Sequence, residues 1–155
     1  MIRGILGYSF RFVTEIEPDR DQAGEVKEFL PQGRYRNKRD LRLNKHGSGP
    51  FCRFRIPRNL PFEGVYAITV DGEIVYVGEC QNLSERFNAR GYGTISPRNC
   101  FEGGQPTNCR VNNCILRRAK QGRKVELWFH ETSNRRLVET ELIRKLEPPW
   151  NAQHV

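Results

Sequence analysis

Alternating apolar and polar positions predict several strands. Residues 64–78, GVYAITVDGEIVYVG, contain two β-branched and aromatic runs around Asp71-Gly72, which is the pattern of a β-hairpin. Residues 124–131, KVELWFHE, alternate and predict another strand. Residues 8–12, YSFRF, alternate in the same way near the N-terminus. The pattern therefore predicts a hairpin and a third strand from residue 64 onward, and a half-buried strand near the N-terminus.

Helices are predicted where apolar positions repeat every three or four residues between a capping residue and a Gly or Pro. Four stretches have this form. They are residues 22–30, capped by Asp21 and ended by Pro31; residues 82–90, with Asn82 near the start and Gly91 past the end; a helix from Thr107 or Asn108 to about Gln121, stopped by Gly122; and RRLVETELIRKLE, capped by Asn134 and broken at Pro148-Pro149.

From Phe62 onward the expected order is β-β-α-α-β-α. This order predicts an α+β fold in which helices flank a small three-stranded antiparallel sheet. Residues 1–61 are expected to form an N-terminal extension, whose stretch from Gln32 to Pro61 is an extended basic arm. Residues 62–155 are expected to form the compact domain.

Length and composition limit the class of protein. A chain of 155 residues suits one domain with an extension. It has no run of about 18 apolar residues, and its N-terminus lacks the apolar core of a secretory signal. Its five cysteines are an odd number with no CxxC pair, which favours reduced thiols in the cytoplasm over disulfides or a structural zinc site. We expect a cytoplasmic protein with no membrane partner.

The formal net charge of +8 indicates a polyanionic partner. Nine Lys or Arg and a single acid, Asp40, lie between Arg34 and Arg58, with aromatic residues interleaved among them. A solvated basic face is the simpler interpretation of such a run. The interleaved aromatics favour nucleic acid.

The hairpin carries two tyrosines, Tyr66 and Tyr76. If the loop is Val70-Asp71-Gly72, with Gly72 as a left-handed bulge residue, Tyr66 lies directly across from Tyr76. A two-residue Asp71-Gly72 turn would place the two rings on opposite faces. Both residues could also be ordinary strand aromatics.

Glu139 is the unusual residue of the last predicted helix. At 100° per residue it falls inside the apolar arc formed by Val138, Leu142, Ile143 and Leu146. A carboxylate aimed at a core is costly unless it is paired, hydrogen-bonded or bound to a cation. Glu139 is therefore either part of a buried ion pair, a residue at the rim of the core, or part of a site.

Four motifs in this order resemble the GIY-YIG nuclease family. GVY at residues 64–66 and YVG at residues 76–78 correspond to its two tripeptides. Leu83 and Arg86 match its leucine and catalytic arginine. VETELIRKLEPPWN, from Val138 to Asn151, matches its closing helix and the asparagine that follows. The resemblance covers roughly residues 62–151 and implies a metal-dependent nuclease.

The resemblance implies a role for each matched residue. Glu139 would bind Mg²⁺ or Mn²⁺, since a hard carboxylate with water and phosphate suits these ions. Tyr66 would orient or deprotonate the attacking water beside Tyr76. A phenol has a pKa near 10 and needs nearby positive charge to act as a base, which Arg86 would supply while contacting the scissile phosphate. Asn151 would hold the geometry of the site.

Two positions depart from the family pattern. Many members have His or Tyr four residues after the catalytic arginine, where this chain has Arg90, one turn further along the expected helix. Arginine cannot act as a general base near neutrality, so Tyr66 suffices, Tyr92 substitutes, or activity is impaired. Glu79 occupies a position where some relatives carry lysine.

The long polar stretch at residues 91–109 looks similar to that of family members that are restriction endonucleases. We therefore expect a site-specific endonuclease of restriction type acting on DNA, with a homodimer on a palindromic site as a possibility. The alternatives are a structure-specific repair or recombination nuclease and a degenerate module that only binds nucleic acid. The expected DNA-binding residues are Arg34, Arg36, Arg39, Arg53, Arg55, Arg90, Arg98, Asn99, Arg110, Arg117, Arg118 and Lys120.

Overall fold

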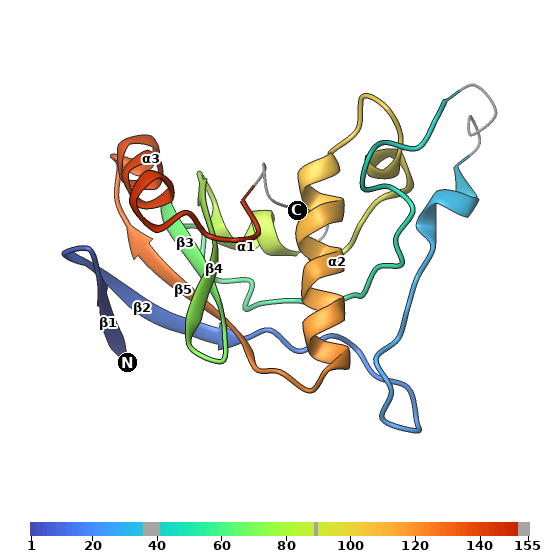
Figure 1. Ribbon diagram of the computed structural model, residues 1–155, viewed down its shortest axis with the longest axis horizontal. Coiled ribbons are helices and arrows are strands. Elements are labelled where there is room, and N and C mark those ends of the chain that lie inside the picture. Colours follow the sequence, from blue (N-terminus) through green and yellow to red (C-terminus); the bar gives the residue numbers. More distant parts are fainter. Residues whose placement is uncertain (36–40, 89, 152–155) are drawn as a thin grey trace. The chain divides into compact units, whose positions relative to one another are not determined.

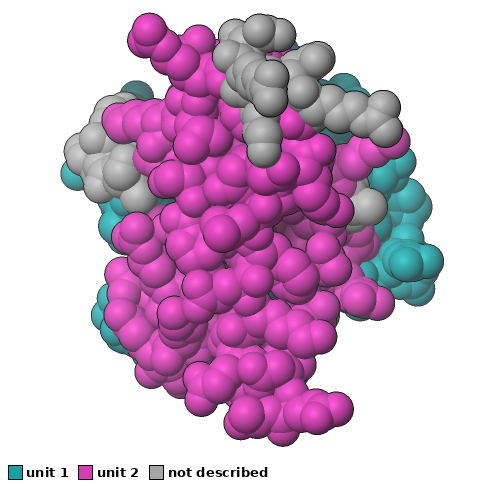
Figure 2. Space-filling view, turned by 90° about the vertical axis from the view of Figure 1, so that its right-hand side faces the viewer, with its two compact units in different colours: residues 1–16, 56–86, 123–155 teal, residues 17–55, 87–122 magenta. Residues whose placement is uncertain are grey.

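The computed structural model describes residues 1–35, 41–88 and 90–151. Two compact units make up the chain (Figures 1 and 2). Unit 1 contains residues 1–16, 56–86 and 123–155, and unit 2 contains residues 17–55 and 87–122. Each unit is built from separated stretches of sequence.

Unit 1 is built on a five-stranded antiparallel sheet in the order β1-β2-β5-β3-β4 (Figure 1). The predicted three-stranded sheet is therefore wrong, although the α+β class holds. The three expected strands form one side of the sheet, and the N-terminal strands continue it through pairing of β2 with β5. The strands are β1 (Ile2–Ile5), β2 (Tyr8–Glu15), β3 (Gly64–Val70), β4 (Glu73–Cys80) and β5 (Val125–Glu131).

Burial of apolar surface explains why the N-terminal strands join the sheet. The alternation at residues 8–12 correctly predicts β2, but its apolar side faces the main core of the unit. Phe10 is fully buried in one cluster with Val65, Ala67 and Trp128. Without β2, strand β5 would have an open edge, because β5 pairs with β3 on its other side.

The β3–β4 hairpin combines a two-residue turn with a bulge. Asp71 and Gly72 both have positive φ, 49° and 86°, as a tight hairpin turn requires. Val70 pairs with Glu73 and Thr69 with Ile74, but Ile68 pairs with Tyr76, which leaves Val75 as an extra residue. Because of the bulge at Val75, Tyr76 lies on the same face of the sheet as Tyr66. A two-residue turn without the bulge would have placed Tyr76 on the opposite face.

Unit 1 contains one complete helix and the first four residues of a short one. Helix α3 (Arg135–Leu146) packs Val138 and Leu142 against the sheet face that carries Val65, Ala67 and Val77 (Figure 1). Helix α1 (Leu83–Phe87) begins after Asn82, whose Oδ1 accepts the Glu85 N–H at 3.1 Å.

Helix α1 is shorter than the sequence predicts. It ends at Phe87, and the Gly91 N–H donates to the Asn88 carbonyl in a turn. Arg90 has a positive φ of 67° and is exposed, so it does not continue the helix beyond Arg86. The expectation that these two arginines share one helical face is therefore wrong.

Unit 2 has its own small core around helix α2 (Pro106–Lys120). Phe51, Ile95, Cys100, Phe101 and Cys109 form one buried cluster. The 3₁₀ helices η1 (Pro31–Arg34) and η2 (Pro97–Cys100) lie in the same unit. The predicted helix at residues 22–30 is absent, and Asp21 Oδ1 instead accepts the N–H groups of Ala23 and Glu25 in a turn.

Asparagine side chains hold the basic arm within unit 2. Asn112 on α2 is fully buried; it donates to the carbonyls of Cys52 and Tyr92 at 2.9 and 2.7 Å and accepts the Cys52 N–H. Asn44 donates to the carbonyls of Asn99 and Phe101. These bonds satisfy backbone groups that lie outside the strands, and they connect the described part of the arm to the rest of unit 2.

All five cysteines are buried free thiols. Over the described residues, no helix has the length and apolar character needed to cross a membrane.

Candidate functional site along strand β4

All five expected catalytic residues belong to unit 1. Tyr66 lies on β3, Tyr76 on β4, Arg86 on α1 and Glu139 on α3, and Asn151 follows α3. β4 is an edge strand of the sheet, so its outward backbone groups have no neighbouring strand. The contacts of the five residues converge on its final stretch, residues 76–80.

Tyr66 and Tyr76 share one face of the sheet. They are diagonal neighbours rather than directly opposed, because Tyr66 pairs with Gly78. Their ring centroids are 6.2 Å apart, with an angle of 32° between the rings. Tyr66 is 1% exposed and Tyr76 is 6% exposed. The shared face was one of the two sequence-based alternatives, but the bulge at Val75, rather than a three-residue loop, produces it.

Gly78 makes room for Tyr66. A Cβ on Gly78 would lie 2.3 Å from the Tyr66 hydroxyl oxygen and 2.4 Å from its Cζ. Gly64 is equally constrained, because a Cβ there would lie 2.2 Å from the His130 carbonyl oxygen. Neighbouring atoms therefore lie too close to the glycines of the GVY and YVG motifs to leave room for a side chain. The absence of a side chain at Gly78 lets the Tyr66 hydroxyl lie against the β4 backbone.

Asn151 binds the outward edge of β4. The Val77 N–H donates to Asn151 Oδ1 at 3.1 Å, and Asn151 Nδ2 donates to the Val77 carbonyl at 2.9 Å. The neighbouring Trp150 N–H donates to the carbonyl of the bulge residue Val75 at 2.8 Å. The segment after α3 thus replaces a missing strand beside Tyr76.

Glu139 contacts the same edge of β4 two residues beyond Val77, at Glu79. It is half-buried, and its carboxylate accepts a hydrogen bond from the backbone N–H of Glu79. Burial raises the pKa of Glu139, and the charge of Glu79 raises it further. The Glu79 N–H and the charge of Arg135 act in the opposite direction. Such a carboxylate gains stability from a nearby cation.

Arg135 and Glu79 form an ion pair that sequence reasoning missed. The Arg135 guanidinium is bonded to Glu79 through Nη1 and lies 3.5 Å from Glu63 through Nε. Arg135 precedes Glu139 by one helical turn, so the two side chains lie on the same side of α3, and this spacing could have indicated Arg135 from the sequence. Its pairing with β4 depends on how α3 packs, which the sequence pattern does not reveal. Glu79 is thus paired with a cation on α3, Arg135.

Arg86 acts electrostatically on the end of β4. Burial raises the pKa of the Cys80 thiol to about 11, while the charges of Arg86 and Arg135 oppose that rise. Both guanidinium groups are therefore close enough to act on Cys80, the residue after Glu79. Residues 76–80 are accordingly flanked by two phenols, one carboxylate and two cations.

A metal ion at this site would have few protein ligands. Within the described ranges, no group of three or more His, Cys, Asp or Glu side chains could hold a metal. Glu79, whose charge acts on Glu139, is engaged by Arg135. A single half-buried carboxylate is compatible with Mg²⁺, which retains water and binds through one or two carboxylates together with phosphate.

Of the expected DNA-binding residues, all those described lie in unit 2. The exposed ones are Arg34, Arg55, Arg90, Arg98, Arg117 and Lys120, while Arg53 and Arg118 are half-buried. Asn99 and Arg110 are buried, at 8% and 7% exposure. Tyr92, considered above as a substitute base, is fully buried in this unit and packs edge-on against Phe87. Arg36 and Arg39 lie outside the described residues.

Several of these residues already have protein partners. Lys120 forms an ion pair of 2.7 Å with Glu28, and Arg53 stacks on Phe29 with its Cζ 4.1 Å from the ring centroid. Arg98 donates to the Glu102 carbonyl, and Arg118 to Gln121. Of these residues, Arg34, Arg55, Arg90 and Arg117 are exposed arginines with no such contact to another described residue.

An enzyme-like site on an edge strand invites comparison with known proteins. No family model matches the chain. The chain is 25% identical over 143 residues to Endonuclease II of Enterobacteria phage T4, an alignment covering 83% of this chain and 98% of that protein. A solved structure of a bacteriophage T4 EndoII mutant aligns with a TM-score of 0.49 and 25% identity, covering 72% of this chain and 86% of that chain. The sequence similarity supports a nuclease.

Proposed function

We propose that this chain is a magnesium-dependent DNA endonuclease of the GIY-YIG type that hydrolyses phosphodiester bonds at specific duplex sites. The observation that carries the proposal is the arrangement along the edge of β4. There the Tyr66 hydroxyl lies against Gly78, and the Glu139 carboxylate binds the amide of the next residue, Glu79. The similarity to an endonuclease over nearly its full length supports the same activity.

Each side chain of the site has its own role in hydrolysis. Tyr66 orients the attacking water and takes its proton, with Tyr76 beside it. Arg86 contacts the scissile phosphate and stabilises the negative charge that builds up on it. Asn151 is a positioning residue, because it fixes the β4 edge through Val77.

Glu139 is the residue that would hold the metal. When bound, Mg²⁺ supplies positive charge to the phosphate and to the departing 3′ oxygen. Arg135 supports Glu139 indirectly, since its pairing with Glu79 neutralises the neighbouring negative charge. The charge of Arg135 therefore opposes the rise in the pKa of Glu139 that burial and Glu79 cause.

Unit 2 would provide the DNA-reading surface. Its exposed arginines suit phosphate contacts, and Arg98 sits on the polar loop before α2. Alanine at Arg98 and at Asn99 is expected to change the preferred sequence, measured by cleavage of a substrate panel. A uniform decrease over all sequences would show that these residues do not read the site. Because Asn99 is buried, its variant also needs a thermal unfolding control.

The test uses wild-type protein, Glu139→Gln and Glu141→Gln on plasmid and branched DNA. Glu141 is a matched control on the same helix, where it bonds to Tyr8 rather than to β4. Discrete plasmid fragments that require Mg²⁺, are abolished by EDTA and disappear only in Glu139→Gln support the proposal. Cutting confined to junctions supports a repair nuclease, and binding without cleavage supports a binding module.

A further inference from the structure

One row of residues crosses the sheet of unit 1 from β2 to β4. Arg11 pairs with Phe129, Phe129 with Tyr66, and Tyr66 with Gly78. Directly paired residues of antiparallel strands project from the same face. Arg11 therefore shares the face of Tyr66 and lies two strand spacings, about 10 Å, from it.

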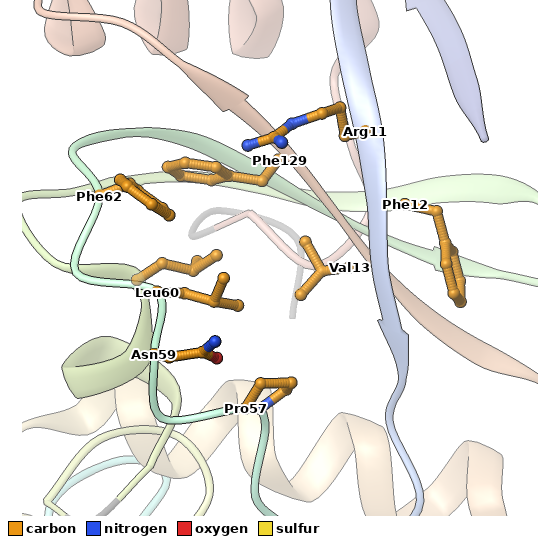
Figure 3. Close-up of a pocket in the computed structure, with 9 residues that line it drawn as sticks. Arg11, Phe12, Val13, Pro57, Asn59, Leu60, Phe62 and Phe129 are labelled. Atoms are coloured by element: carbon orange, nitrogen blue, oxygen red, sulfur yellow. The ribbon is translucent and has the colours of Figure 1, made fainter.

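A cavity of about 230 Å³ opens beside this row (Figure 3). Phe62, Leu60 and Phe129 form its apolar walls, and Arg11 and Asn59 contribute its polar groups. In Figure 3 the Arg11 guanidinium lies beside the ring of Phe129, Phe62 lies on the other side of that ring, and Asn59 lies below Leu60. The volume is below that of a drug-sized ligand site and suits one planar ring.

The polar groups of this cavity are available to a ligand. Arg11 and Asn59 are exposed, and across the described ranges neither side chain has a hydrogen bond or an ion pair. The backbone of the segment that carries Asn59 is fixed, because the Leu60 N–H donates to Ser84 Oγ and Ser84 Oγ donates to the Pro57 carbonyl. The cavity thus combines aromatic walls, one cation and one amide on a held backbone.

We propose that this cavity holds one unpaired nucleotide of the DNA substrate, with its base against Phe62 and Phe129 and its phosphate on Arg11. Asn59 can donate to and accept from the edge of the base. The inference rests on the proposed nuclease function and adds to it a binding site for a base lifted out of its stack. Aromatic walls accept any base, so the site favours an unstacked base over a particular sequence.

Charge and spacing favour a nucleotide over other ligands. The whole chain carries +8, and Arg11 adds an unpaired cation on the face of Tyr66. Successive phosphates of one B-form strand are about 3.4 Å apart along the axis, so a 10 Å offset corresponds to about three phosphates. The captured nucleotide would therefore lie about three phosphates from the bond that Tyr66 addresses.

The binding test uses the full chain in EDTA, so that affinity is measured without metal-dependent cleavage. Fluorescence anisotropy gives the Kd for a nonathymidylate probe and for the same probe with an abasic central position. Wild-type protein should bind the complete probe about fivefold or more tightly than the abasic one. Leu60→Trp, which fills the cavity, and Phe62→Ala, which removes a wall, should each abolish this difference.

Arg11→Gln and Arg144→Gln form the matched charge pair. Both residues are exposed arginines of unit 1, but Arg144 does not line the cavity. Arg11→Gln should weaken binding of both probes severalfold, whereas Arg144→Gln should change either Kd less than twofold. Thermal unfolding of each variant checks that the fold is retained, and a variant that unfolds is replaced by the other cavity variant.

Photo-cross-linking locates the base directly. A probe with one central 5-iododeoxyuridine should cross-link to the peptide that contains Phe62, identified by mass spectrometry. Equal affinity for the two probes in wild-type protein, or cross-links confined to unit 2, would overturn the inference. Failure of the proposed nuclease function is seen separately, as absence of Mg²⁺-dependent cleavage by wild-type protein.

Discussion

The Asn151 side chain takes the place of a partner strand for Val77. Its amide supplies both the donor and the acceptor that a neighbouring strand would have offered, at 2.9 and 3.1 Å. The pair is buried, because Asn151 is 9% and Val77 1% exposed. The edge of β4 beside Tyr76 is therefore closed by a side chain from another part of the chain.

Replacing Asn151 should destabilise the fold as well as the site. Asn151→Ala leaves the N–H and the carbonyl of Val77 without a partner and should cost about 2 kcal/mol in the free energy of unfolding. Asn151→Asp keeps the acceptor but turns a charged oxygen toward the Val77 carbonyl, so it should be no better. Urea denaturation measures both, and hydrogen exchange should show faster exchange at Val77. Unchanged exchange there would contradict the role.

Gly78→Ala should be among the most damaging small substitutions. The added methyl meets the ring of Tyr66, which is buried and has little room to move. We expect a loss of about 1–3 kcal/mol in unfolding free energy. Gly4→Ala is the matched control, since a Cβ there has no atom within 4 Å. In a double-mutant cycle, Tyr66→Ala should recover part of the loss, and strict additivity would contradict the clash.

Glu139→Gln should stabilise the metal-free protein at neutral pH. Burial raises the pKa of Glu139 in the folded protein, so at a pH above that pKa the ionised carboxylate lowers the free energy of unfolding. Below the ordinary carboxyl range, Glu139 is protonated in both the folded and the unfolded protein, and the effect disappears. The melting temperature of the variant should exceed that of wild type by a few degrees at pH 7, and the two should converge near pH 4. Mg²⁺ should raise the melting temperature of wild type alone.

Glu141→Gln is expected to have the opposite sign. The hydrogen bond from Tyr8 and the contact with Lys145 lower the pKa of Glu141, so its charge stabilises the fold above the ordinary carboxyl range and the effect is lost in acid. Glu141→Gln should therefore melt slightly below wild type at pH 7. A shift in the same direction for both variants would contradict the electrostatic explanation.

Arg135→Gln should raise the pKa of Glu139. Without the guanidinium, the charge of Glu79 acts on Glu139 unopposed. Glu79→Gln should lower the same pKa, while Arg136→Gln, which changes the exposed neighbour of Arg135, should leave it near the wild-type value. NMR titration of labelled glutamate carboxyls in metal-free protein measures all three. No movement in Arg135→Gln would remove Arg135 from the site.

Exposed arginines of unit 2 should determine the salt dependence of DNA binding. Arg55→Ala and Arg117→Ala should each weaken binding to all sequences alike and reduce the slope of log K against log salt by about one. Arg144→Ala, at an exposed position on α3 of unit 1, is the control. An equal effect in the control would show that overall charge, rather than unit 2, binds DNA.

Local pattern predicts the elements of this fold better than it predicts their assembly. The strands at residues 64–80 and 125–131 and the helices α2 and α3 follow from short-range periodicity. The predicted cap of α2 at Thr107 or Asn108 is wrong, because the helix begins at Pro106 after Gln105, and Asn134 precedes α3 without a side-chain cap bond. The helical period also places Glu139 toward the interior, where it is half-buried. The pairing of β2 with β5 joins segments more than a hundred residues apart, so no local signal indicates the five-stranded sheet.

Single residues account for the remaining differences. The bulge at Val75 reverses the facing of Tyr76, but a β-branched residue within a strand does not indicate a bulge. Asp21 can cap either a helix or a turn, and the bridge between Arg20 and Val26 leaves it in a turn. Arg135 becomes part of the candidate site only through the packing of α3 against β4.

The two units alternate along the chain, and this limits how the protein can be truncated or fused. The chain passes from one unit to the other after residues 16, 55, 86 and 122. Neither a truncation from one end nor a fusion of one half to another protein can separate the unit with Tyr66 from the unit with α2. A transplantable recognition module would have to be made by joining residue 55 directly to residue 87, so that residues 17–55 and 87–122 form one chain.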